Sequence, residues 1–299
     1  MKIGIISDVH SNIVALKACI EYMESVSCDE YFFLGDFISD TPYTRETMDF
    51  IYEFMGKAPC HFLRGNREEY MLQQRETVAE HREKQRWLWN SASGNLLYSY
   101  EQLEERDFSF FQNLPIFFRY EKGDCPPITC CHGSPANTRE LLLMNRENTQ
   151  RWLEQIDTRY LICAHTHYPC SMRYYGKYYF NPGCVGIAIG DFGFAQCMIL
   201  EDVIERERKE WKPLFLKIPY DNKRVVEDIR KRGLLDKAPW FMNSNIQILL
   251  TGIDHSAELV HSASDKAKAA DKEAVWPRIP EQYFEEAAKE LEIPDYRLM

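Results

Sequence analysis

Short apolar segments alternate with helical patterns along the first third of the chain. Residues 2–7 form an apolar run typical of a buried strand, and the apolar positions between 13 and 23 recur at helical spacing. Two further apolar runs, at 31–34 and 61–63, enclose a second helical pattern at 48–55. The order strand, helix, strand, helix, strand predicts a parallel layer with crossover helices.

The middle of the chain is first helical and then rich in strands. Residues 67–114 carry an apolar face at helical spacing, which predicts a helical insert. After it, the pattern is broken by helix only at 137–155, so the second half predicts a second sheet packed against the first. The strands expected in this half are 116–120, 128–131, 160–163, 178–180, 194–200 and 214–218.

The pattern changes again beyond residue 220. Residues 222–232 and 239–250 predict two helices, and 281–291 predicts a short amphipathic helix. The stretch 254–276 is rich in Ala, Lys, Asp and Ser, which fits either a solvated helix or a linker. The last helix has an apolar stripe with two possible partners. It docks either on the body of the same chain or on a second subunit of a homo-oligomer. The stripe consists of Tyr283, Phe284, Ala287 and Leu291.

These patterns divide the chain into two predicted parts. Residues 1–220 form the first, with the helical insert at about 67–114, and residues 221–299 form a helical C-terminal extension. The insert also carries aromatic residues that either pack its core or stack a nucleobase. They are Trp87, Trp89, Tyr98 and Tyr100.

Composition excludes several classes of protein. With 45% hydrophobic and 27% charged residues, global disorder is excluded. A net charge of −10 disfavours sequence-independent binding of long nucleic acids. The N-terminus lacks the pattern of a secretory signal, and no apolar run reaches the length of a membrane span, so we expect a cytoplasmic protein without a membrane partner. The ten cysteines contain no Cys-x-x-Cys pair and are expected to be buried, reduced thiols.

Side chains that can bind metal follow five of the predicted strands. In open α/β sheets, ligands bind where the carboxyl ends of the strands meet, so these side chains are expected to converge. Singly, the aspartates and the asparagine would be turn or cap residues, and each histidine an ordinary one. The residues, in strand order, are Asp8 and His10; Asp36; Asn66; His132; His165 and His167.

The residue types favour a particular kind of ion. Imidazole nitrogens with carboxylate and amide oxygens, and no thiolate, suit divalent Mn, Fe, Zn, Ni or Co, with Mn the first choice. Side chains two residues apart align on one face of an extended segment, as in Asp8-x-His10 and His165-x-His167. Asp36 is the candidate to bridge two ions at roughly 3.5–4 Å separation. The four remaining histidines (His61, His81, His255 and His261) lack such context.

The ordered set Asp8-x-His10, Gly35-Asp36, Gly65-Asn66, His132-Gly133 and His165-x-His167 resembles the calcineurin-like metallophosphoesterases. The similarity is greater to the bacterial and archaeal branch of YfcE-like and diadenosine-tetraphosphatase-like enzymes. The segment Asn181-Pro182-Gly183-Cys184-Val185-Gly186 looks like the Asn-Pro-Gly-Ser-Val-Gly turn of that branch. The resemblance covers roughly residues 1–250.

The resemblance implies a fold and a reaction. The fold would be a four-layered α/β/β/α sandwich, here with a helical extension, and the reaction would be hydrolysis of a small phosphorylated substrate by in-line attack of a hydroxide that bridges two divalent ions. One ion would be held by Asp8, His10, Asp36 and His167, and the other by Asp36, Asn66, His132 and His165. The catalytic residues would be Asp36, Asn66, Arg67, His132 and His165.

The sequence departs from the family pattern at two positions. Arg67 stands where the family usually has a histidine that contacts phosphate or acts as an acid, and Ala164 replaces a usual glycine. Arginine cannot give up a proton at working pH, although it can hold a phosphate in bidentate fashion. Arg67 is therefore either a phosphate contact or the partner of a carboxylate, with Glu69 or Glu105 as candidates.

The sequence leaves the substrate class open. Phosphomonoesters, phosphodiesters, dinucleoside polyphosphates and phosphoproteins all fit the motifs, whereas long DNA fits poorly because no basic stripe is visible. The alternative function is a metal-binding scaffold of the same fold with little or no catalysis, which the missing third-motif histidine favours.

Overall fold

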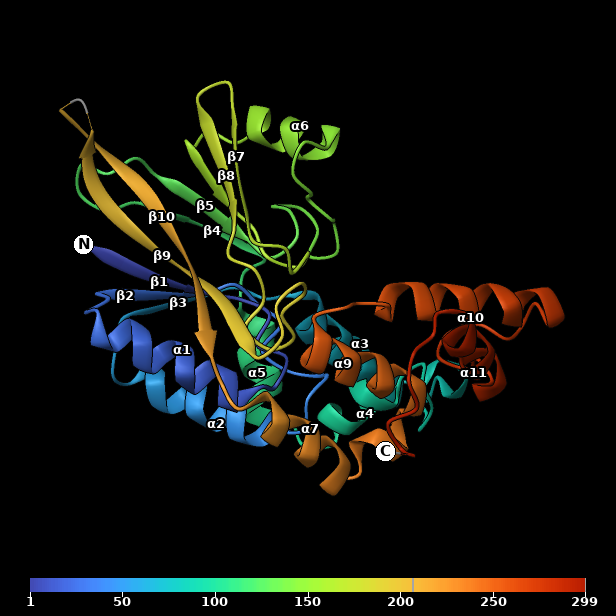
Figure 1. Ribbon diagram of the computed structural model, residues 1–299. Coiled ribbons are helices and arrows are strands. Elements are labelled where there is room, and N and C mark those ends of the chain that lie inside the picture. The colour runs from blue at the N-terminus through green and yellow to red at the C-terminus, as the bar shows by residue number, and fades with distance from the viewer. Residues whose placement is uncertain (206, 299) are drawn as a thin grey trace.

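In this computed structural model, which describes residues 1–205 and 207–298, ten strands form two five-stranded sheets that face each other (Figure 1). The first sheet contains β1 (Lys2–Ile6), β2 (Glu30–Phe33), β3 (Cys60–Phe62), β9 (Phe194–Glu205) and β10 (Arg208–Pro219). Its order is β10-β9-β1-β2-β3, with β1, β2 and β3 parallel and β9 antiparallel to both of its neighbours.

The second sheet has the order β4-β5-β6-β8-β7. Its central strands β5, β6 and β8 are parallel, and the edge strands β4 and β7 are antiparallel to their neighbours. Parallel strands need crossover connections, which explains why strands and helices alternate in the sequence. The strands are β4 (Phe117–Tyr120), β5 (Ile128–Cys131), β6 (Tyr160–Ile162), β7 (Cys170–Tyr174) and β8 (Lys177–Asn181).

Burial on both faces explains the apolar run at the N-terminus. Ile3 and Ile5 of β1 point into the core between the two sheets, whereas Ile6 faces the helices on the other side. A strand covered on both faces is expected to be continuously apolar rather than alternating. The shared core also holds Phe32 of β2 and Ile162 of β6, so the two sheets are joined by a single apolar layer.

Helices cover the two outer faces and complete four layers. On the first sheet lie α1 (Ile13–Ser25) and α2 (Thr44–Met55), and α6 (Glu147–Gln155) covers the second (Figure 1). The side chain of Asn12 accepts a hydrogen bond of 3.1 Å from the Ala15 amide, so it caps α1. The predicted α/β/β/α sandwich is confirmed.

Further helices build the insert and the C-terminal extension. The insert contains α3 (Asn66–Ala79), α4 (Gly94–Tyr100), α5 (Glu105–Asn113) and a 3₁₀ turn (Glu83–Gln85). The extension contains α7 (Asn222–Lys231), α8 (Leu234–Lys237), α9 (Pro239–Thr251), α10 (Ser256–Ala270) and α11 (Glu281–Glu290). No helix in the described ranges is long and apolar enough to cross a membrane.

Within the extension, α7, α8 and α9 contribute to the large core beside the first sheet, whereas α10 and α11 share a small core of their own. Residues 254–276 hold a helix, α10, whose Leu259 and Ala263 are buried against Phe284 and Ala287 of α11. Trp240 of α9 belongs to the same cluster. The apolar stripe of α11 is therefore used for docking inside the chain.

Three segments differ from the sequence expectation. Residues 137–146 are irregular, because the carbonyls of Leu141 and Leu143 accept hydrogen bonds from the side chains of Asn148 and Thr149. Strand β7 escaped prediction because it is an edge strand with a single buried residue, Met172. Strand β10 begins six residues earlier than expected, at Arg208, since the charged residues of its first half suit an exposed edge.

We predict that Phe284→Ala lowers the free energy of unfolding by about 3–5 kcal/mol, because the phenyl ring is fully buried and its loss leaves a cavity. Urea denaturation followed by circular dichroism measures the change. Leu298→Ala removes an exposed side chain near the same end of the chain and should leave stability within about 0.5 kcal/mol of the parent. Equal effects of the two substitutions would contradict docking of α11.

Candidate metal centre

The loops that follow the strands are tied to one another by backbone hydrogen bonds. The Asp8 amide donates to the Gly35 carbonyl at 3.1 Å, and the His10 amide donates to the Asp36 carbonyl at 3.0 Å. The Gly186 amide donates to the Asp8 carbonyl at 2.9 Å, which brings in the turn before β9. A Cβ atom on Gly186 would lie 2.1 Å from the Val9 carbonyl oxygen, so only glycine allows this approach.

Five of the predicted ligands have a left-handed backbone. Such a conformation costs about 1–3 kcal/mol for a residue other than glycine, and it persists only where surrounding contacts enforce it. Aspartate and histidine tolerate it better than most residues, but a cluster of this kind is typical of a functional site. The φ angles are 52° for Asp8, 48° for His10, 53° for Asp36, 65° for His165 and 61° for His167.

One half of the centre brings two imidazoles and a carboxylate together. The Nε2 atoms of His10 and His167 face each other at 3.1 Å, and His167 Nε2 lies 3.3 Å from Asp8 Oδ1. Asp8 Oδ1 is buried and has no hydrogen-bond partner within the described residues. Facing nitrogen atoms and an orphaned carboxylate oxygen are both satisfied by a cation, so this donor set fits a divalent metal ion.

The other half is built around His132. Its Nδ1 lies 2.7 Å from the Leu34 carbonyl, which orients the ring and directs Nε2 towards Asp36 Oδ1 at 3.4 Å and Asn66 Oδ1 at 3.0 Å. The ring of His165 lies 5.0 Å from that of His132, measured between centroids. Ligand atoms of Asp36, His132 and His165 all lie within 4.8 Å of one another.

The structure thus brings all seven predicted ligands into one site. They fall into overlapping groups of possible ligand atoms, each group within 4.8 Å: Asp8, His10 and Asp36; His10, His167 and Cys184; and Asp36, His132 and His165. Asn66 joins the third group through its contact with His132.

Charges inside the centre compensate one another. Burial alone would raise the pKa of Asp36. The positive charges of His132, His10 and Arg67 lower it by more than burial raises it, so this carboxyl has a pKa well below its usual range. Burial lowers the pKa of His132, whereas Asp36 raises it to about 9. Burial and the charge of His132 lower the pKa of His165 to about 4. The carboxylates therefore stay ionised in the interior.

Arg67 forms ion pairs, but not with the partners considered from the sequence. Its guanidinium lies 2.9 Å from Asp40 Oδ2 and 3.9 Å from Asp36 Oδ2. Glu69 instead approaches Arg64 at 3.7 Å, and Glu105 pairs with a different arginine, Arg75. Arg67 is thus anchored next to the candidate ligands.

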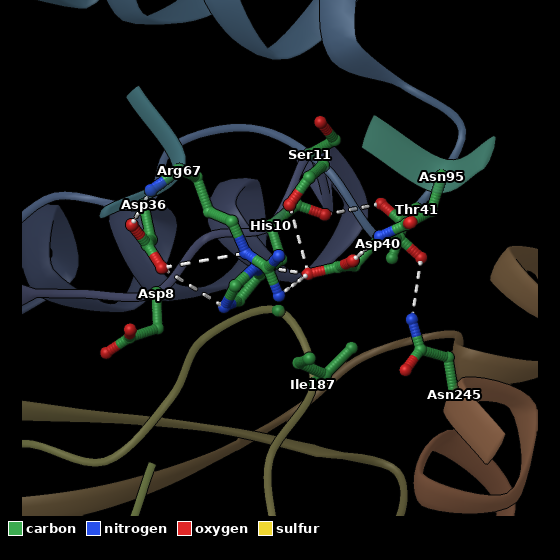
Figure 2. Close-up of polar contacts among 12 residues, drawn as sticks. Asp8, His10, Ser11, Asp36, Asp40, Thr41, Arg67, Asn95, Ile187 and Asn245 are labelled. Carbon is green, nitrogen blue, oxygen red and sulfur yellow. Dashed lines mark hydrogen bonds and ion pairs between the residues drawn. The ribbon is translucent and has the colours of Figure 1, made fainter. Parts of the chain in front are cut away.

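Asp40 is a site residue that the sequence reasoning missed. Its Oδ2 lies 2.8 Å from His10 Nδ1, and its Oδ1 accepts a hydrogen bond of 2.5 Å from Asn95 of α4 (Figure 2). This contact leaves His10 Nε2 directed at the centre and also holds Arg67 in place. Asp40 lies in the loop after β2, four residues beyond Asp36, but it belongs to none of the motifs, so no signal in the sequence singled it out.

Glu68 is a second missed residue, and it supports the loops rather than the ions. Its carboxylate accepts hydrogen bonds from the amides of Gly65 (2.8 Å), Asp36 (2.9 Å) and Phe37 (2.8 Å). Burial and the negative charge of Asp36 raise the pKa of Glu68 to about 7. A glutamate three residues after a helix cap is the signature of a capping box, which was the available signal.

Cys184 is a third residue whose position was not anticipated. It occupies the serine position of the turn noted in the sequence, and its Sγ donates to the Asp8 carbonyl at 3.1 Å. Its sulfur also lies in the group formed with His10 and His167. The thiol therefore contacts the loop that carries Asp8.

We predict that Glu68→Gln lowers the free energy of unfolding by about 1–3 kcal/mol, because the amide nitrogen of glutamine cannot accept from the backbone N–H groups that the carboxylate satisfies. Urea denaturation of the metal-free protein measures the change. Glu21→Gln on the exposed face of α1 is the matched control and should have almost no effect. A stability equal to the parent would show that the three hydrogen bonds are not needed.

Solved structures resemble this fold over most of the chain. A hypothetical protein from Pyrococcus horikoshii OT3 aligns with a TM-score of 0.68 and 19% identity, covering 85% of this chain and 99% of that one. A metallophosphoesterase from Sphaerobacter thermophilus aligns with a TM-score of 0.64 and 24% identity, covering 85% of this chain and 100% of that one. No curated protein matches the sequence.

The family comparison covers the part of the chain that carries all seven candidate ligands. The calcineurin-like phosphoesterase family matches residues 1–195, which is well over half of the 299 residues. The order of the metal-competent residues, the two facing sheets and the convergence of the strand-end loops agree with that match. The chain belongs to the calcineurin-like phosphoesterase family.

Proposed function

We propose that this protein is a phosphoesterase that hydrolyses a small phosphorylated substrate at two divalent metal ions. The observation that carries the proposal is the buried Oδ1 atom of Asp8, which has no hydrogen-bond partner among the described residues and lies 3.3 Å from His167 Nε2, beside the facing nitrogens of His10 and His167. Burying a carboxylate oxygen without a partner is costly, and a cation at this point offsets that cost.

The ligands divide between two ions, with Asp36 between them. One ion would take Asp8, His10, Asp36 and His167, and the other would take Asp36, Asn66, His132 and His165. Both halves mix imidazole nitrogen with hard oxygen donors, so Mn is the ion to try first, followed by Fe, Zn, Ni and Co. When bound, such ions supply an activated water and neutralise charge on the phosphoryl group.

Residues of the chain position the substrate. Arg67 and His165 lie where the centre meets a neighbouring cleft, and both can donate hydrogen bonds to phosphoryl oxygens. Arg67 is held by Asp40, so its guanidinium needs little reorganisation when phosphate binds. A charged donor fixed in this way stabilises the negative charge that develops during hydrolysis. The name of the Sphaerobacter thermophilus structure, a metallophosphoesterase, agrees with this chemistry.

We predict that Asp36→Asn reduces both the bound divalent metal and the hydrolysis of p-nitrophenyl phosphate and bis-p-nitrophenyl phosphate by more than about 100-fold, because the shared carboxylate is lost. Metal content is measured by elemental analysis after loading with Mn, and hydrolysis by release of p-nitrophenol. Asp124→Asn, an exposed position, is the control and should match the parent. A metal-free parent, or full activity of Asp36→Asn, would contradict the proposal.

The alternative is a metal-binding scaffold with little or no catalysis, and the arginine at position 67 is the observation that favours it. Hydrolysis by the Arg67→His variant separates the two functions. We predict a loss of at least about tenfold in kcat/KM, because a neutral imidazole cannot replace a fixed guanidinium at the phosphate. A large gain would show that the native site lacks an acid, and it would support the scaffold.

A further inference from the structure

A cleft of about 930 Å³ opens directly beside the candidate metal centre. Its lining includes Asn66, Arg67 and His165 from the candidate centre and Trp276 and Pro277 from the C-terminal extension. The volume lies in the range of sites that bind whole small molecules, and it far exceeds the needs of a phosphate group alone.

Two helices from distant parts of the chain form facing walls of this cleft. On α3, the lining residues recur at helical spacing from Arg67 through Tyr70 and Gln74 to Thr77, so they share one face. On α10, Ser256, Val260 and Ser264 do the same. The stretch from residue 66 to 77 spans about 16 Å along α3 at the usual rise per residue. The cleft therefore extends well beyond the reach of a phosphoryl group.

The C-terminal extension is fixed to the insert beside the cleft. The Trp276 indole donates to the Ala92 carbonyl at 2.8 Å, and the Asn90 side chain donates to the Pro277 carbonyl at 3.0 Å. Glu281 accepts hydrogen bonds from the amide and the hydroxyl of Ser91. Trp276, Pro277 and Glu281 lie outside the family match of residues 1–195, so this part of the lining comes from the extension.

Two buried polar side chains in the cleft lack protein partners. Gln74 and Thr77 are only 4% and 7% exposed, line the cleft, and form no side-chain hydrogen bond within the described residues. Neither residue has a fully buried, unpaired polar atom, so these groups reach the open space of the cleft, where a ligand with donors and acceptors on its edge would pair with them. The cleft thus has polar groups suited to a heterocycle rather than to a purely apolar ligand.

Aromatic and cationic side chains complete the lining. The Trp276 ring packs edge-on against Trp87, with 6.4 Å between the centroids, yet the residue stays 43% exposed, so it offers a fixed platform for a planar ring. The charged lining residues are Arg67, Arg82 and Arg139 against Glu76 alone. Arg67 pairs with Asp40 and Arg82 with Glu80, whereas Arg139 forms no ion pair within the described residues, so Arg139 is the cation most available to an anionic ligand.

We propose that this cleft binds a nucleotide, with its phosphoryl group at the metal centre, its base against Trp276 and the edge of the base bonded to Gln74. The proposal deepens the proposed function, on which it rests for the orientation of the phosphate. An aromatic platform with adjacent amides and arginines recognises a base and its phosphate together. A phosphorylated aliphatic compound would leave both Trp276 and Gln74 unused.

Binding is tested separately from turnover by titrating the full-length protein with adenosine 5′-monophosphate and following tryptophan fluorescence. We expect saturable quenching at least tenfold tighter than binding of inorganic phosphate measured by calorimetry. Trp276→Leu should remove most of the quenching and weaken binding about tenfold. Trp89→Leu is the matched control, because Trp89 is also 43% exposed but lies under Lys237 outside the cleft. Equal effects of the two tryptophan variants would overturn the proposal.

Gln74→Met tests the hydrogen bond between Gln74 and the base. It provides a second test in case Trp276→Leu destabilises the C-terminal extension. The methionine keeps the length of the side chain but removes its hydrogen-bonding amide, so we expect calorimetry to show about threefold to tenfold weaker nucleotide binding. Binding of inorganic phosphate should stay unchanged. Unchanged nucleotide affinity in this variant would contradict the role given to Gln74.

Turnover is tested with two esters that share one leaving group, bis-p-nitrophenyl phosphate and the p-nitrophenyl ester of thymidine 5′-phosphate. We expect the nucleoside ester to have at least a tenfold higher kcat/KM, and we expect Gln74→Met to reduce this advantage while bis-p-nitrophenyl phosphate stays within about twofold. Hydrolysis of both esters without a nucleoside advantage would overturn the nucleotide site and leave the phosphoesterase intact. Nucleotide binding without hydrolysis of any ester would overturn the proposed function and keep the nucleotide site.

Discussion

The structure depends on keeping two carboxylates, Asp8 and Asp36, ionised in a place that water does not reach. Ions in a protein interior are stable only where opposite charges and hydrogen bonds compensate for lost hydration. Here the compensation comes from four imidazoles and from Arg67, supplied by four separate segments that follow β1, β3, β5 and β6. The loops after β1, β2 and β6 adopt a strained backbone, and backbone hydrogen bonds tie the first two of them together. The two sheets, in turn, set the positions from which the loops begin.

Most of the architecture could be predicted because it rests on local periodicity. A strand buried on both faces, such as β1, leaves an apolar run, and α1 leaves apolar positions at helical spacing. The seven candidate ligands could also be predicted from the sequence, because each one follows a strand and the ends of the strands converge. Edge strands were harder, since β7 and the first half of β10 bury few residues and carry charges that resemble a loop.

The supporting residues and the cleft depend on contacts between distant positions, and no local pattern encodes such contacts. Asp40 matters because Asn95, His10 and Arg67 happen to surround it in space. The cleft exists because α10 lies opposite α3, although nearly two hundred residues separate Asn66 from Ser256 in the sequence. The stretch that holds α10 could be taken for a linker because its buried face consists mainly of alanine, which is a weak hydrophobic signal. The division into a body and an extension at residue 220 stays a prediction.

The position of β1 in its sheet has a consequence for biosynthesis. This strand leads into Asp8 and His10 and leaves the ribosome long before β9, whose first residue is Phe194, yet one of its two edges pairs with β9. At typical elongation rates of about 5–20 residues per second, β9 is synthesised on the order of ten seconds or more after β1, and this edge of β1 stays unpaired during that time. An unpaired apolar strand edge invites pairing with other chains. Nascent or prematurely terminated chains of this protein should therefore depend on chaperones until β9 has been synthesised.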